Sequence, residues 1–127
     1  MKINEITGQI VDAAISVHSA LGPGLLESAY ETCLAHELRS RGLQVETEVS
    51  LPVVYNGIQL DAGYRIDLLV AKSVIVELKS VEKMISLYDA QLLSYLKLSK
   101  IQVGFLINFN VTRLKDGLKR MVNDFQD

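Results

Sequence analysis

The sequence predicts an α/β (α+β) fold in which a central mixed four-stranded sheet is flanked by helices. Three observations support this. Apolar residues recur at helical spacing in two long N-terminal segments, and the pattern changes to strand-like runs between about residues 46 and 79. A helical segment then separates this region from a further apolar strand. The expected order is α-α-β-β-β-α-β-α, in a single domain over residues 1–127.

Two helices are expected at the start of the chain. Residues 4–20 carry apolar side chains at intervals of three or four, and the stretch Gly22-Pro23-Gly24 ends this helix. A second helix follows over about residues 24–41. Gly42 stands where a C-terminal cap is expected.

Three strands should follow the helices. Residues 46–51 alternate between polar and apolar side chains. Asn56-Gly57 accepts the positive φ of a type I′ turn, so the chain is expected to reverse there. The second strand covers about residues 58–70, with Gly63 at a bulge or bend, and residues 74–79 form the third strand.

The last part of the chain returns to helices. A helix is expected over about residues 86–98. Residues 101–109 are almost entirely apolar, as in a strand buried on both faces. An amphipathic, basic helix over about residues 112–124 should end the fold, so extra helices are expected at both ends of the core.

Composition limits the classes of protein that this chain can be. An apolar content of 49% with a net charge of −2 excludes intrinsic disorder. The single cysteine, Cys33, excludes an intramolecular disulfide and a cysteine-based zinc site. No stretch of about 18 apolar residues and no signal-like start are present, so a cytoplasmic protein without a membrane partner is expected. Residues 1–63 carry 3 basic and 8 acidic groups and residues 64–127 carry 10 and 7, which leaves a basic patch on the later half open.

Charged residues interrupt two of the apolar strands. Asp67 lies in the second strand, and Glu77 and Lys79 lie two apart in the third, so the latter two point to the same side. If residues 71–73 form a three-residue turn, Asp67 lies directly opposite Glu77, with Cβ atoms about 4.5–5.5 Å apart. Two facing carboxylates repel each other unless a cation lies between them.

A divalent cation resolves this repulsion, and carboxylate oxygens suit Mg²⁺, with Mn²⁺ as its substitute. A lysine beside such a metal can stabilise the negative charge that develops on a phosphoryl group during hydrolysis. The pattern of Asp67, Glu77 and Lys79 is therefore a candidate for metal-assisted phosphodiester hydrolysis. An exposed sheet face with ordinary cross-strand ion pairs is the alternative.

These residues resemble the core of the PD-(D/E)XK nuclease superfamily, whose common core is also αβββαβ. The stretch Gly24-Leu25-Leu26-Glu27-Ser28-Ala29-Tyr30 is similar to the signature of the GxxExxY proteins, a group placed in that superfamily. Together the two motifs extend the resemblance from about Leu21 to Asn108. In place of the proline in the superfamily's name, Ile66 precedes Asp67.

The resemblance implies roles for several residues. Asp67 and Glu77 would bind the metal together with the main-chain carbonyl of Leu78. Glu27, from the second helix, would be a further acid that contacts the metal or its water. Lys79 would be the catalytic lysine.

A second motif lies in the helix over residues 86–98. Gln91 and Tyr95 resemble the QxxxY motif of RecB-like members, and their spacing of four places them on one helix face, where they can border the site. Gln91 is expected to assist catalysis, and Tyr95 to contact nucleic acid. Arg65 and Lys83 are candidate phosphate contacts, with ordinary surface positions as the alternative.

The function expected from these observations is that of a Mg²⁺-dependent nuclease acting on DNA, with RNA as the second choice of substrate. One alternative is a catalytically inactive protein of nuclease fold that binds nucleic acid or another protein. Another is a structural subunit whose apolar surface is completed by a partner. The apolar content also leaves a homodimer open.

Overall fold

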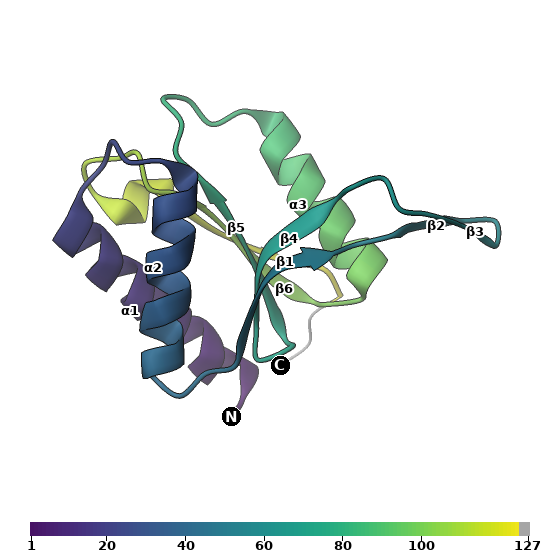
Figure 1. Cartoon of the computed structure of the whole chain (residues 1–127), viewed down its shortest axis with the longest axis horizontal. Helices are drawn as coiled ribbons and strands as arrows, with labels where there is room; N and C mark the ends of the chain where they lie inside the picture. The colour runs from purple at the N-terminus through teal and green to yellow at the C-terminus, as the bar shows by residue number, and fades with distance from the viewer. Residues whose placement is uncertain (125–127) are drawn as a thin grey trace.

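A five-stranded mixed sheet separates two layers of helices (Figure 1). The structure is a computed structural model, and it describes residues 1–124. Strands β5 and β6 run parallel, and the other neighbouring pairs of this sheet are antiparallel. In spatial order the strands are β1 (Val45–Ser50), β4 (Arg65–Val70), β5 (Val74–Lys79), β6 (Val103–Asn108) and β7 (Leu118–Val122).

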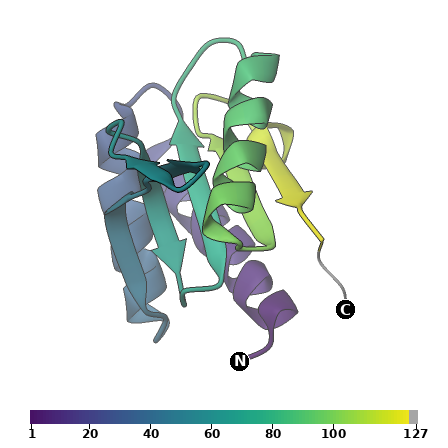
Figure 2. The same ribbon diagram turned by 90° about the vertical axis from the view of Figure 1, so that its right-hand side faces the viewer.

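The helices cover both faces of the sheet. Helices α1 (Ile3–Leu21) and α2 (Glu27–Ser40) pack on one face, and α3 (Ser86–Ser99) crosses the other (Figures 1 and 2). Each face has its own apolar core, and β5 contributes to both because successive side chains alternate between them. This arrangement confirms the predicted α/β class. Within the described part of the chain, no helix is long and apolar enough to span a membrane.

A two-stranded arm projects from the sheet beyond β1 and β4 (Figures 1 and 2). It consists of β2 (Val53–Tyr55) and β3 (Ile58–Leu60), joined by Asn56 and Gly57, whose φ angles are 48° and 79°. The predicted reversal at Asn-Gly is therefore confirmed. The strand predicted over residues 58–70 is instead two strands, interrupted by four residues that include Gly63 at a φ of 84°.

This interruption changes the register between the arm and the main sheet. In the arm Val53 pairs with Leu60. The same register, continued from the arm into β1 and β4, would place Glu48 opposite Arg65. The chain has four residues between β3 and β4 but only two between β1 and β2. The extra two residues shift the pairing, so that Glu48 falls opposite Asp67, between the pairs Thr47–Leu68 and Val49–Ile66.

The C-terminal helix predicted over residues 112–124 is wrong. This segment forms a 3-10 turn, η1 (Leu114–Gly117), and then strand β7, so the sheet has five strands instead of the four predicted. Strand β6 is buried along its whole length, and without β7 one edge would leave unpaired backbone groups in the interior. Gly117 packs so closely against the Asn108 carbonyl that a Cβ atom would not fit. Long-range pairing thus overrides the local helical pattern.

Candidate active site

The central feature of the site is the point where β4 and β5 separate. The pairs Val70–Val74, Leu69–Ile75 and Leu68–Val76 follow the predicted register. At the next position, the side chains of Asp67 and Glu77 interrupt the backbone pairing of the two strands. The Asp67 N–H donates to Glu77 Oε2 at 2.7 Å, and the Leu78 N–H donates to Asp67 Oδ2 at 2.8 Å. Each carboxylate is therefore fixed by a backbone donor on the opposite strand, and both are brought together as expected.

Glu48 joins these two acids from the other side of β4. Its φ of 51° is unusual for a residue other than glycine, and it marks a sharp change in the direction of β1. Before this point Val45 packs under α1 and α2, whereas Leu51 packs under α3. The acids Glu48, Asp67 and Glu77 therefore occupy one row across three strands.

Two more acids come from α2. Glu27 and Glu31 lie one helical turn apart, and carboxylate oxygens of Glu31, Glu48 and Asp67 all lie within 4.8 Å of one another. Glu31 and Glu48 were not predicted from the sequence. The spacing of Glu31 four residues after Glu27 was a usable signal, but the position of Glu48 depends on the shifted register.

The electrostatics of the cluster reflect burial and a surplus of negative charge. Burial, followed by the charge of Asp67, raises the pKa of Glu77 to about 8, and this side chain is only 7% exposed. Burial also raises the pKa of Asp67 to about 6. The pKa of Glu31 rises to about 8 through burial and then through a hydrogen bond with the Glu48 carboxyl. The pKa of Glu27 is raised, because burial outweighs the opposing charge of Lys79.

This donor set fits a hard divalent cation. All five side chains offer carboxylate oxygens, and Asp67 and Glu77 keep an oxygen in addition to the one that accepts a backbone N–H. Burial first, and then the neighbouring negative charges, raise the pKa of Asp67 and Glu77, so a positive counter-charge would favour their ionised forms. A bound Mg²⁺ or Mn²⁺ would supply that charge.

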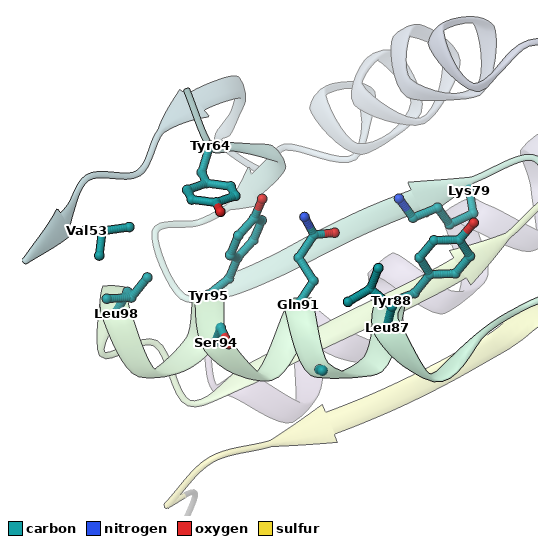
Figure 3. A pocket seen from close by; sticks show the side chains of 10 residues that line it. Val53, Tyr64, Lys79, Leu87, Tyr88, Gln91, Ser94, Tyr95 and Leu98 are labelled. Carbon is teal, nitrogen blue, oxygen red and sulfur yellow. The ribbon is translucent and has the colours of Figure 1, made fainter. Parts of the chain in front are cut away.

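Lys79 is the last residue of β5 and lies beside the cluster. Its positive charge acts on Glu27, Asp67 and Glu77 and offsets part of the rise in the pKa of each. Its Nζ atom lies 4.5 Å from the centroid of the Tyr88 ring, a cation–π contact that holds the ammonium group at the end of the strand (Figure 3). The structure thus brings the predicted lysine and the predicted acids together.

A groove runs from Lys79 along α3 (Figure 3). Its volume is about 690 Å³, and Gln91 extends its amide group into it (Figure 3). Tyr95 lines the groove further along, with Tyr64 edge-on to it at a centroid distance of 6.1 Å. Burial raises the pKa of Tyr95 to about 12, with smaller contributions from the Glu77 and Asp67 charges. Gln91 and Tyr95 therefore line the same groove as Lys79, and their roles at the site stay predictions.

The two predicted phosphate contacts lie further out. Arg65 Nη1 donates to Ser50 Oγ and to the Tyr64 carbonyl, and it lies 3.8 Å from an Asp61 oxygen. Lys83 is exposed in the segment between β5 and α3. Contact of either side chain with phosphate stays a prediction.

Tyr30 positions the start of α2. Its ring stacks on Phe109 at 4.5 Å, and its hydroxyl donates to the Gly22 carbonyl at 2.5 Å and accepts the Leu25 N–H at 3.2 Å. The loop that leads into α2 is thereby tied to the core. This contact explains how a buried tyrosine three residues after Glu27 can fix the position of that acid.

Comparison with known proteins gives one match. The family model of the PD-(D/E)XK nuclease superfamily matches residues 4–121, which is most of the chain. No curated protein and no solved structure matches significantly. The finer resemblances to the GxxExxY group and to RecB-like members stay predictions.

Proposed function

Since the chain belongs to the PD-(D/E)XK nuclease superfamily, we propose that it is a Mg²⁺-dependent nuclease that hydrolyses phosphodiester bonds of DNA in the cytoplasm. The observation that carries the proposal is the pair of carboxylates, Asp67 and Glu77, each held by a backbone N–H of the facing strand beside Lys79. A hydrolase of this kind needs fixed oxygen ligands and a nearby cation. The oriented carboxylates and the Lys79 ammonium group, at the point where β4 and β5 separate, support this proposal.

Asp67 and Glu77 are the proposed metal ligands, together with the main-chain carbonyl of Leu78. Glu27 is the proposed further acid, and Glu31 and Glu48 are close enough to share the ion or the water around it. When bound, Mg²⁺ would supply positive charge beside the scissile phosphate and lower the pKa of a water molecule. The Asp67 N–H donates to the Glu77 carboxylate and the Leu78 N–H donates to the Asp67 carboxylate. These bonds would keep both carboxylates oriented before the ion arrives.

Lys79 is the proposed catalytic lysine. Its ammonium group would orient the attacking water and stabilise negative charge on the phosphoryl oxygens as the transition state forms. The Tyr88 ring limits the positions that this flexible side chain can take. Gln91, one turn further along α3, would donate its amide N–H to the substrate at the rim.

A second candidate function is a catalytically inactive binding module. The favouring observation is the ratio of five acids to one lysine at the site, because without a cation this surface repels a phosphate backbone. The two functions differ in one measurable respect. A nuclease turns over substrate in a manner that depends on the metal, and a module does not.

The test is hydrolysis of end-labelled DNA and RNA, single-stranded and duplex, with Mg²⁺ or Mn²⁺. The parent should cleave DNA, and Asp67→Asn and Lys79→Met should each reduce the rate at least about 100-fold. The matched control is Glu82→Gln, an exposed acid in the loop after β5, which should cleave like the parent. Failure of the parent to cleave any of these substrates would favour the binding module.

A further inference from the structure

The groove along α3 differs in chemistry from the carboxylate cluster that it joins. Among the described residues that line it, Lys79 alone is charged. The remaining lining is aromatic, apolar or an uncharged polar group: Val53, Tyr64, Leu87, Tyr88, Ala90, Gln91, Ser94, Tyr95 and Leu98. Such a surface is poorly suited to a duplex, whose binding depends on several lysines or arginines along the phosphate backbone.

We propose that this groove binds unpaired bases of a single strand, so that the scissile phosphate next to them reaches the carboxylate cluster. This inference rests on the proposed nuclease function and adds the substrate class. Lys79 links the two regions, because it lines the groove and also interacts electrostatically with Asp67 and Glu77. A strand lying in the groove is therefore continuous with the site of cleavage.

The aromatic side chains are placed for stacking. Tyr64 is 43% exposed and stands at the groove wall, supported edge-on by Tyr95 (Figure 3). A ring exposed to this extent can stack with a base, and base stacking on an aromatic side chain contributes about 1–3 kcal/mol. The Gln91 amide, which projects between Tyr95 and Tyr88 (Figure 3), offers both a donor and an acceptor to a base edge.

The length of the groove sets how much strand it can hold. Tyr88, Gln91, Tyr95 and Leu98 share one face of α3, and the ten helical steps from Tyr88 to Leu98 span about 15 Å. At the spacing of about 3.4 Å per phosphate of a duplex strand this distance holds about four nucleotides, and a more extended single strand places fewer there. Lys79 is the charged group of the groove, so the affinity should depend only weakly on salt. For each phosphate contacted, the logarithm of the affinity should fall by about 0.7 for every tenfold rise in salt concentration.

The test uses the full chain and a 12-nucleotide single strand that carries 2-aminopurine, whose fluorescence falls when the base stacks. Binding is measured in Ca²⁺, and cleavage of the same strand and of its duplex is measured in Mn²⁺. We expect single-strand binding at least about 10-fold tighter than duplex binding. Tyr64→Ala should weaken it by about 5- to 100-fold, as the loss of one stacked base predicts.

Two variants separate stacking from general damage. Tyr64→Phe keeps the ring and should bind within about 2-fold of the parent. Tyr55→Ala removes a tyrosine that is 68% exposed on the arm, outside the groove lining, and it should also bind like the parent. Equal effects of Tyr64→Ala and Tyr55→Ala, or equal affinity for single strand and duplex, would overturn the inference.

The outcomes distinguish this inference from the function on which it rests. Quenching that Tyr64→Ala abolishes, without cleavage of any substrate, would support the groove and refute the nuclease. Cleavage of duplex as fast as single strand would support the nuclease and refute the groove. A dimer that Leu87→Ser dissociates, without quenching by the single strand, would assign the groove to a second copy of the chain and overturn the inference.

Discussion

Replacing Glu77 with glutamine should stabilise the metal-free protein at pH 8 and change its stability much less at pH 5. The carboxyl group of Glu77 is buried next to Asp67, and its pKa in the folded protein is raised to about 8. Glutamine has nearly the same shape, and its side-chain oxygen can still accept the Asp67 N–H. The substitution therefore removes the buried charge and keeps the hydrogen bond.

The magnitude follows from proton linkage. The folded pKa of Glu77 is raised above the unfolded value of about 4.5, so the folded state binds more protons and loses stability as pH rises between these values. At 1.36 kcal/mol per pKa unit, the raised pKa of Glu77 lowers the free energy of unfolding by at most about 4 kcal/mol at pH 8. At pH 5 the same shift lowers it by less than about 1 kcal/mol. Asp67 and Glu77 interact, so the raised pKa belongs in part to the pair. We therefore expect Glu77→Gln to raise the free energy of unfolding by about 1–3 kcal/mol at pH 8.

The assay is urea unfolding in EDTA at both pH values, with Glu82→Gln as the control for loss of one exposed acid. In 1 mM Mn²⁺ the order should reverse, because the parent gains binding energy and the variant loses a ligand. A variant that is no more stable than the parent at pH 8, or equally more stable at both pH values, would show that Glu77 carries no destabilising buried charge.

Three further substitutions test separate parts of the structure. Lys79→Met should slow DNA cleavage at least about 100-fold, as cleavage kinetics would measure. It should leave the Mn²⁺ affinity unchanged or higher, because a repelling cation is lost. Weaker Mn²⁺ binding in calorimetry would contradict this expectation. Glu48→Gly should keep or raise the melting temperature in calorimetry, because a φ of 51° favours glycine, and a large fall would count against the strained backbone. Gly117→Ala should lower the free energy of unfolding by about 2 kcal/mol or more, because its Cβ would clash with the Asn108 carbonyl; an unchanged urea midpoint would contradict the position of β7.

The central part of the site could be predicted from the sequence because it depends on local geometry. A short turn between β4 and β5 fixes the register, and that register alone brings Asp67 near Glu77. Two-residue alternation then places Lys79 on the same side as Glu77. Neither step needs information from distant parts of the chain.

Other features depend on contacts that sequence patterns do not reveal. Glu48 reaches Asp67 only because the segment around Gly63 shifts the pairing of β1 with β4 by two residues. The C-terminal segment has helical spacing, yet it forms β7 because β6 needs a partner along its second edge. A glycine in the middle of the predicted helix, Gly117, was the local signal against it.

Titration of the pure protein with Mn²⁺ tests whether Asp67 and Glu77 hold a divalent metal ion, without any choice of substrate. Calorimetry would compare the parent with Asp67→Asn, Glu77→Gln and the control Glu82→Gln at pH 7.5. We expect saturable binding by the parent and the control, and a loss of at least about 10-fold in affinity for each site variant. Binding that survives both site substitutions, or no binding by the parent at millimolar Mn²⁺, would contradict it.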